Sequence, residues 1–342
     1  MQLTLQKIFI THTLRFAKPV AKFRTQFAYE DIFPMLAGKI ISQTAHQKYG
    51  DFLYQQLLAP LGMNRTYVDG EAKLYESKNV SQRFEYFSGR IYSYPEHSAF
   101  SAKLLTLEDG SNASGGIKSS ANDMAKWLIF NINNGESEKF YAKGWFVDTQ
   151  EYKPYTVLYH SGGGRGMHAL MAYIPQKKIG IVILTNTWGN KVPDALYQRF
   201  FDLYLNKKPL KNWSEVYLQA WKKFEVKEKN ALSKPEQCQV MKTADLKKYA
   251  GIYYNPVYGD LEMTKQGDHL SLKIGPASVT WKLTPCKNNI FQAHWPNAYG
   301  MSLPMFFPSQ GLITFTMKEN GEIDKMTIPY LNGDGNGIFE KK

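Results

Sequence analysis

Five consecutive residues of this sequence are a histidine, a serine and three glycines, His160-Ser161-Gly162-Gly163-Gly164. They directly follow the apolar stretch Thr156 to Tyr159. Far upstream, Tyr29 and Asp31 come just before a helical pattern. Glycines on a strand leave room for a substrate to lie against the strand edge, which a Cβ would obstruct. Residues of these types suit acyl transfer, which needs a nucleophile, a group that takes its proton and two backbone N–H donors for the oxyanion. The two segments are therefore candidates for chemistry on an amide or ester.

Both segments and their surroundings resemble the second and third motifs of the serine β-lactamase and penicillin-binding-protein superfamily, on its class C-like branch. The matching stretches are Phe27 to Ile41, Pro60-Leu61-Gly62-Met63-x-x-Thr66, Asn112 to Met124, His160 to Gly164, Tyr173-Ile174-Pro175 and Gly180 to Asn186. The resemblance implies a hydrolase that forms an acyl-serine intermediate. Its substrate would be a small amide or ester, such as a D-amino acid peptide, a β-lactam or an ester.

The resemblance also assigns roles to individual residues. Tyr29 falls at the family's tyrosine, which helps to shuttle the proton of the nucleophile, and His160 opens the H-x-G form of the third motif. The backbone N–H of Gly163 would supply one oxyanion donor. The substrate-binding residues implied by the match are Asp31, Ser161 and Gly162. Asp31 stands where the family has asparagine, so an acceptor-only carboxylate replaces an amide donor and substrate recognition there is expected to differ.

The family's nucleophile is the serine of an S-x-x-K motif that lies upstream of the tyrosine. No serine of this chain, from Ser42 to Ser309, has lysine three residues later, and the sequence holds no nucleophile by match. We therefore expect a first domain truncated at its N-terminus, inactive as this chain, with apolar surface left exposed. Three hypotheses stay open: a truncated serine hydrolase, a non-catalytic binding protein that uses the same cleft, and the product of a disrupted gene.

Composition limits the function classes further. The 342 residues are enough for two domains, 43% are hydrophobic, and no run of 18 apolar residues predicts a transmembrane segment. The net charge of +12 comes from scattered lysines without a nucleic-acid motif, so nucleic acid is not an expected partner. The family resemblance implies a small-molecule or peptide substrate in intact relatives. The basic segment before Tyr29 predicts a helix rather than a presequence. Cys238 and Cys286 could form one disulfide, and localisation and oligomeric state stay open.

The fold class is α+β. Residues 1–205 are expected to form a truncated β-lactamase/transpeptidase-like domain, an antiparallel sheet with flanking helices. Residues 206–244 read as a charged helical linker, with aromatic residues at helical spacing. Residues 245–342 read as an all-β, barrel-like domain with hairpin turns at Gln266-Gly267-Asp268 and Asn320-Gly321. This last part is similar to a β-rich domain of unknown function that is often appended to such hydrolases.

Hydrophobic periodicity predicts the elements of the first domain. Helices are expected at Ile32 to Leu58, after Ser119-Ser120-Ala121-Asn122-Asp123, and at Pro193 to Tyr204. Strands are expected at Trp145 to Val147, Thr156 to Tyr159, His168 to Ile174 and Ile179 to Leu184. The stretch Gly70 to Leu107 reads as a long irregular connection.

Other motifs are set aside. Gly164 to Ala169 fits the dinucleotide pattern G-x-G-x-x-A, but a strand follows it instead of a helix, and Thr185-Asn186 occupies the place of the acidic residue. Ser120-Ala121-Asn122 fits an S-x-N motif by chance, because Tyr29 already fills that role. The histidines show no spacing typical of a zinc site. We therefore expect neither a metal nor a cofactor.

Overall fold

The computed structural model describes residues 14–16, 19, 21–22, 25–27, 29–68, 79–87, 89–93, 112–134, 144–164, 166–208, 211–232, 245–274, 279–286, 289–294, 310–331 and 337–342. The chain divides into two compact units. We call Asp31–His97 with Leu104–Lys227 the sheet unit. We call Met1–Glu30, Ser98–Lys103 and Glu228–Lys342 the barrel unit. Each is described by itself.

The sheet unit is built on a four-stranded antiparallel sheet in the order β3-β4-β5-β6. The strands are β3 (Phe146–Asp148), β4 (Val157–Gly164), β5 (Met167–Ile174) and β6 (Ile179–Thr185). A short 3-10 turn, η3 (Pro175–Lys177), joins β5 to β6. All four strands were predicted, and β4 runs further than expected, through the three glycines.

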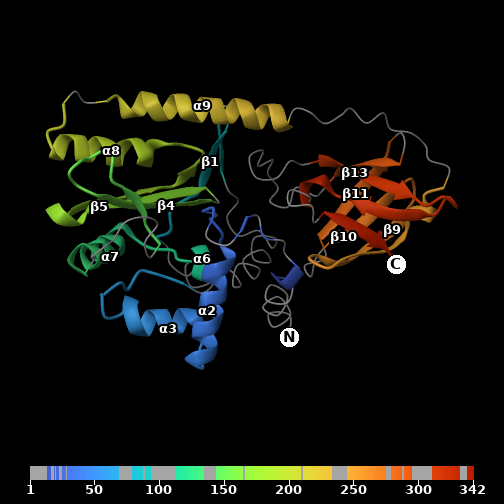
Figure 1. Cartoon of the computed structure of the whole chain (residues 1–342), viewed down its shortest axis with the longest axis horizontal. Helices are drawn as coiled ribbons and strands as arrows, with labels where there is room; N and C mark the ends of the chain where they lie inside the picture. Colours follow the sequence, from blue (N-terminus) through green and yellow to red (C-terminus); the bar gives the residue numbers. More distant parts are fainter. Residues whose placement is uncertain are drawn as a thin grey trace. The chain divides into compact units, whose positions relative to one another are not determined.

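Helices cover both faces of this sheet (Figure 1). Because side chains alternate along a strand, Leu158 and Tyr173 face one side and pack with Leu128 of α7 (Ala121–Asn134). The opposite side packs against Phe201 of α8 (Val192–Tyr204). Both helices were predicted. The result is a helix–sheet–helix arrangement that fixes β4, the strand of the His160 motif, between two apolar layers.

A long helix, α9 (Trp213–Leu232), lies along α8 (Figure 1). Trp213 and Trp221 are 8% and 9% exposed, two turns apart on its buried face. The indole N–H of Trp213 donates to Oδ2 of Asp202 in α8, at 2.6 Å. The predicted helix is therefore confirmed, and its first half is packed against the sheet unit.

The predicted helix from Ile32 to Leu58 is broken in two. Its first part, α2 (Ile32–Thr44), ends where His46 adopts a left-handed conformation, with φ of 53°. The second part is α3 (Tyr49–Leu53), followed by the π-type turn η2 (Tyr54–Leu58). The stretch expected to be helical is thus helical in two parts, with the break at residues 45–48.

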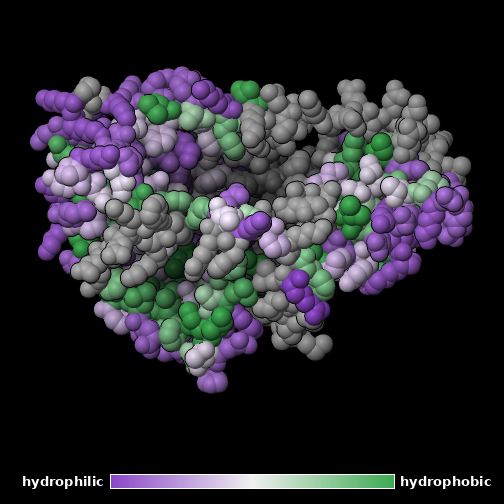
Figure 2. All heavy atoms as spheres, in the orientation of Figure 1, coloured by the Kyte–Doolittle hydropathy of each residue, from purple (hydrophilic) through white to green (hydrophobic). Residues whose placement is uncertain are grey.

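The outer face of α2 is apolar. Phe33 and Ile40, seven residues apart and therefore on one face of the helix, are 66% and 61% exposed. Figure 2 shows hydrophobic side chains gathered over the region of α2 and α3. On the opposite face, Gly38 allows α6 (Asn112–Gly115) to approach, since a Cβ at this position would lie 2.5 Å from Cβ of Ala113. The helix thus buries its glycine and turns its larger apolar side chains to solvent.

The prediction of an irregular connection between Gly70 and Leu107 was wrong for its middle part. A hairpin of β1 (Phe84–Phe87) and β2 (Arg90–Ser93) forms there, with Gly89 at a positive φ of 80°. β1 also pairs in parallel with β7 (Thr187–Trp188), which follows β6. The local pattern is weak because most of β2 is exposed and because the partner of β1 lies far along the sequence. The flanking stretches 69–78 and 94–111 lie outside the described residues.

The barrel unit contains a closed barrel of eight antiparallel strands, as predicted. Its strands are β8 (Gly251–Asn255), β9 (Gly259–Gln266), β10 (His269–Ile274), β11 (Val279–Pro285), β12 (Ile290–His294), β13 (Gln310–Met317), β14 (Ile323–Thr327) and β15 (Ile338–Lys341). Short 3-10 turns lie at η1 (Leu14–Phe16), η4 (Lys247–Tyr249) and η5 (Pro329–Leu331). Both predicted hairpin turns are confirmed, with Gly267 and Gly321 at positive φ.

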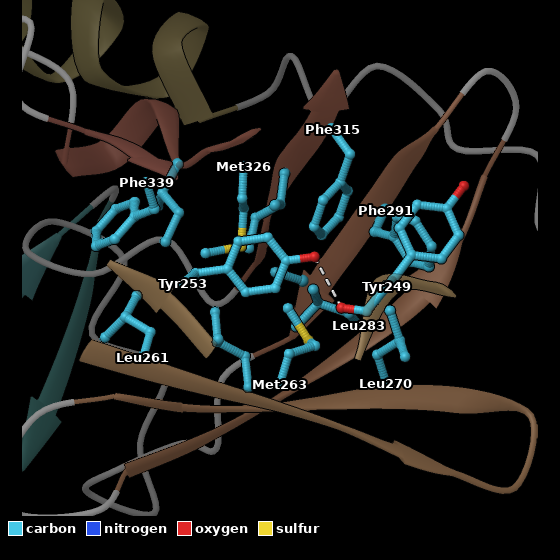
Figure 3. Packing of buried hydrophobic residues seen from close by; sticks show 14 of the residues in the cluster. Tyr249, Tyr253, Leu261, Met263, Leu270, Leu283, Phe291, Phe315, Met326 and Phe339 are labelled. Carbon is cyan, nitrogen blue, oxygen red and sulfur yellow. Dashed lines mark hydrogen bonds between the residues drawn. The ribbon is translucent and has the colours of Figure 1, made fainter. Parts of the chain in front are cut away.

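Side chains fill the interior of the barrel (Figure 3). The rings of Tyr249, Phe291 and Phe315 meet edge to face, with centroids 4.8 to 5.2 Å apart. Tyr253 is fully buried, and its hydroxyl donates to the carbonyl oxygen of Tyr249 at 2.8 Å. The described part of the barrel is therefore a packed core, consistent with a structural role.

The structure also bears on the cysteines and on membrane-spanning helices. Cys286 is disulfide-bonded, and the one other cysteine, Cys238, lies outside the described residues. Among the helices in the described ranges, none is both long and apolar enough to span a membrane.

Candidate active site

The His160 motif lies on β4 where this strand continues beyond its pairing with β3. β3 pairs with β4 only at Val157, Leu158 and Tyr159. Of the strands in the described ranges, only β5 pairs with the following residues, His160 to Gly164. Ser161, Gly162 and Gly163 are exposed. One edge of β4 therefore presents backbone N–H and C=O groups that an extended ligand could pair with.

His160 lies at the start of this edge and is half-buried. Its ring stacks on Phe146 of β3, with centroids 5.4 Å apart and planes at 26°. Burial lowers the pKa of His160, against the opposing effects of a hydrogen bond to the Ser161 backbone and the charge of Asp31. The imidazole is therefore neutral at neutral pH.

Asp31 immediately precedes α2, and its carbonyl oxygen accepts a hydrogen bond from the backbone N–H of Met35 at 3.3 Å. The side chain is exposed. Because its charge acts on His160, the sheet unit brings together the carboxylate and the imidazole that sequence analysis assigned to the same site.

The two middle glycines differ in their surroundings. A Cβ at Gly162 would have no atom within 4 Å, so this position faces open space. A Cβ at Gly163 would lie 1.8 Å from the indole of Trp188. The argument that glycine leaves room for a substrate therefore fits Gly162, whereas at Gly163 the room is taken by a side chain of the protein itself.

Tyr29 stands two residues before Asp31 and is 52% exposed. It belongs to the barrel unit, whereas Asp31, His160, Ser161, Gly162 and Gly163 belong to the sheet unit. The structure thus brings five of the six candidate residues into one unit, and the role of Tyr29 stays a prediction.

Sequence analysis missed the importance of Asp123, which it treated only as part of a helix start. This buried carboxylate in α7 accepts hydrogen bonds at Oδ2 from the backbone N–H of Arg65 at 2.7 Å and from the Thr66 hydroxyl at 2.9 Å. Lys126 pairs with its Oδ1 at 3.2 Å and also donates to the carbonyl oxygen of Gly62. Asp123 therefore ties the Gly62 to Thr66 loop to α7, the helix that supports the sheet below β4.

Sequence analysis assigned no role in the site to two further residues, Trp188 and His168, because neither belongs to one of the family motifs. His168 is 5% exposed and pairs in register with Gly163 across β4 and β5. The one available signal was the apolar alternation of β5, in which a histidine at an inward position interrupts the pattern. In the part of the chain that the structure describes, no group of three His, Cys, Asp or Glu residues could hold a metal ion.

Replacing Asp31 with asparagine should lower the pKa of His160 further, because the carboxylate charge now raises it against the effect of burial. A histidine titration followed by NMR on the full chain measures this directly. His168 serves as an internal control, since the charges that act on its pKa are those of Asp194 and Lys191. An unchanged or raised pKa of His160 in Asp31→Asn would contradict the expectation.

Comparison with known proteins shows the family of this chain. The family model described as Beta-lactamase matches residues 7–202, more than half of the sequence, and the chain belongs to this family. A second model, a domain of unknown function called DUF3471, matches residues 237–337, which include most of the barrel. The resemblance inferred from the motifs and the α+β fold class with a C-terminal barrel are thereby confirmed.

Individual relatives are distant. The chain is 24% identical over 279 residues to unguisins hydrolase ungD' of Aspergillus campestris, an alignment of 74% of this chain and 52% of that protein. It is 24% identical over 192 residues to protein flp of Staphylococcus aureus, covering 49% and 35% of the two chains. The chain thus spans about half the length, or less, of the curated relatives it matches.

Solved structures are similar to this chain only at a low level. The octameric penicillin-binding protein homologue from Pyrococcus abyssi is 22% identical, with a TM-score of 0.49, over 90% of this chain and 64% of that one. A class C beta-lactamase is 18% identical, with a TM-score of 0.39, over 50% of this chain and 55% of that one.

Proposed function

We propose that this chain forms the histidine–glycine wall of the substrate cleft of a β-lactamase-related amide or ester hydrolase, and that the chain as it stands performs no acyl transfer. The observation that carries this proposal is the exposed stretch Ser161 to Gly163 of β4, which among the described strands pairs with β5 alone. The chain has no serine in an S-x-x-K motif, so the covalent step has no nucleophile of the family's type.

The open edge suits an extended amide substrate. A peptide that lies along β4 beside Ser161 to Gly163 can pair with the strand edge there, and the open space at Gly162 lets the peptide approach closely. In this proposal the substrate is a D-amino acid peptide, a β-lactam or an ester, as in the superfamily that the motifs resemble. Ser161 and Gly162 border the substrate, and Asp31 replaces an amide donor with an acceptor.

The resemblance to the family supplies the chemical roles. By match, the backbone N–H of Gly163 is one donor for the oxyanion, and Tyr29 corresponds to the tyrosine that moves the proton of the nucleophile in relatives that have one. Neutral His160 can donate or accept one hydrogen bond at the start of the edge. Without a nucleophile these groups bind and polarise a carbonyl but form no covalent intermediate.

Labelling of the full chain tests the catalytic half of the proposal. We expect no covalent labelling by a fluorescent penicillin or by a serine-reactive fluorophosphonate, while a class C β-lactamase treated in parallel is labelled. Stoichiometric labelling of any serine, Ser161 included, would overturn it.

A binding measurement tests the other part of the proposal, that a peptide binds along β4. An N-acylated D-alanyl-D-alanine peptide should bind the full chain saturably, as measured by calorimetry. Gly162→Val should abolish this binding without loss of stability, because the added side chain enters open space beside the strand edge. Equal binding by wild type and Gly162→Val would place the ligand elsewhere.

The alternative function is a non-catalytic binding protein that uses the same cleft, and the exposed, unobstructed position of Gly162 is equally suited to it. The coding DNA immediately upstream of Met1 separates the two. An in-frame S-x-x-K segment there favours the hydrolase, and an unrelated gene or a promoter favours the binding protein.

A further inference from the structure

Trp188 lies where Gly163 would otherwise carry a side chain. A Cβ at Gly163 would be 1.8, 2.4 and 2.9 Å from three carbon atoms of the indole ring, and these are its three nearest neighbours. The indole therefore rests directly against the backbone of the residue that the proposed function uses as an oxyanion donor.

The backbone of Trp188 is held from one side by the β1 hairpin. In the parallel pairing of β1 with β7, Glu85 is the register partner of Trp188. The backbone N–H of Phe84 donates to the carbonyl oxygen of Asn186 at 2.9 Å, and the Asn186 side chain donates to the carbonyl oxygen of Gln82, also at 2.9 Å. A segment from a distant part of the sequence thus fixes the strand that carries the indole.

The ring of Trp188 is held from another side by His168. The two rings meet edge to face, with centroids 5.5 Å apart and planes at 69°. Nδ1 of His168 lies 3.2 Å from the carbonyl oxygen of Asn190, and because a carbonyl oxygen only accepts, Nδ1 carries the proton of this contact. Nε2 lies 3.9 Å from Oδ2 of Asp194, near the start of α8.

Asn190 closes the turn that follows Trp188. Its side-chain N–H donates to the carbonyl oxygen of Thr187 at 2.7 Å, and its Oδ1 accepts from the backbone N–H of Val192 at 3.0 Å. The Thr185 hydroxyl donates to the carbonyl oxygen of His168 at 3.0 Å. The turn is therefore tied both to itself and to β5.

We propose that Trp188 is a positioning residue for Gly163, and that His168 holds Trp188 in that position. The inference rests on the proposed function, in which the Gly163 N–H stabilises the reacting carbonyl. An oxyanion donor is effective only when it is fixed in place before the substrate arrives. A flat ring against a glycine backbone restricts movement of that backbone on one face while leaving the strand edge free for the substrate.

The test uses the full, isotopically labelled chain and two readouts: the NMR order parameter of the Gly163 backbone amide and the dissociation constant of the N-acylated D-alanyl-D-alanine peptide. Trp188→Ala should lower the order parameter and weaken binding about tenfold, the loss of one well-placed hydrogen bond. Trp188→Phe keeps a flat ring and should retain both properties to within about twofold. Trp145→Ala is the matched control, because Trp145 packs on Tyr173, with ring centroids 5.1 Å apart.

The outcomes separate this inference from the proposed function. If Trp188→Ala lowers only the melting temperature and the Gly163 order parameter is unchanged, the positioning role is overturned. If the wild-type chain binds no peptide but Trp188→Ala still lowers the order parameter relative to Trp145→Ala, the positioning role stands and the proposed function fails. Should Trp188→Ala not fold, His168→Gln gives the same readouts, and an unchanged Gly163 order parameter in that variant overturns the role of His168.

Discussion

Phe315→Ala is expected to unfold the barrel at a much lower temperature and to leave the unfolding of the sheet unit unchanged. Phe315 is 5% exposed and meets the rings of Tyr249, Tyr253 and Phe291 at centroid distances of 5.0, 5.8 and 5.2 Å (Figure 3). Truncation of a phenylalanine in such a core costs about 3–5 kcal/mol. A small domain has only about 5–15 kcal/mol of stability in total, so the change is large.

Differential scanning calorimetry of the full chain measures this effect as the loss or downward shift of one transition. Ile252→Ala is the control, since Ile252 is 37% exposed on the outer side of β8 and its truncation leaves no cavity in the core. If Phe315→Ala and Ile252→Ala behaved alike, the barrel core would not be organised around these rings.

The second large effect is expected for Asp123→Ala. The substitution leaves the Arg65 N–H, the Thr66 hydroxyl and the ammonium group of Lys126 without their shared acceptor. A buried donor left unsatisfied costs about 1–3 kcal/mol, so we expect the free energy of unfolding of the sheet unit to fall by about 3 kcal/mol. Denaturant titration monitored by tryptophan fluorescence gives this value, and Asp51→Ala, at an exposed position in α3, is the control.

The same contact predicts a dependence on pH. Burial by itself raises the pKa of Asp123, but the hydrogen bonds from Arg65, Thr66 and Lys126 outweigh it, and the net pKa is lowered from 3.8. The stabilisation is therefore fully present above the pKa of the unfolded chain and is lost as the pH falls through the lower, folded-state pKa. Asp123→Ala should remove this part of the acid dependence, and an unchanged acid profile would contradict the assignment.

Local signals in the sequence were sufficient for much of the fold. Gly267 and Gly321 mark hairpin turns that the structure contains, because a short turn and its flanking alternation lie within one short window of sequence. Leu270 and Leu272, whose alternation predicted a strand of the first hairpin, are both fully buried in β10. The aromatic spacing predicted an amphipathic helix, and Trp213 and Trp221 are buried in α9.

Contacts between distant segments could not be predicted in this way. The pairing of β1 with β7 joins residues far apart in the sequence, and neither strand carries a strong pattern. Sequence analysis singled out Gly163 but could not predict why a glycine is needed there. Nothing in the sequence indicates that Trp188 lies against the backbone of Gly163. Asp123 looked like an ordinary helix-start residue, although its partners are on another loop.

The closure of the barrel has a consequence for how the chain folds. β15 pairs with β8, with Glu340 opposite Tyr254 and Lys341 opposite Tyr253, so the last strand of the barrel completes the ring against the first. Contacts between segments so far apart in the sequence form slowly, because the intervening chain must be ordered before these contacts contribute to stability. During synthesis, β8 and β14 each keep an unpaired edge until residues 338–341 leave the ribosome. The incomplete ring is then open to pairing with other chains, and this interval is when the protein is most exposed to aggregation.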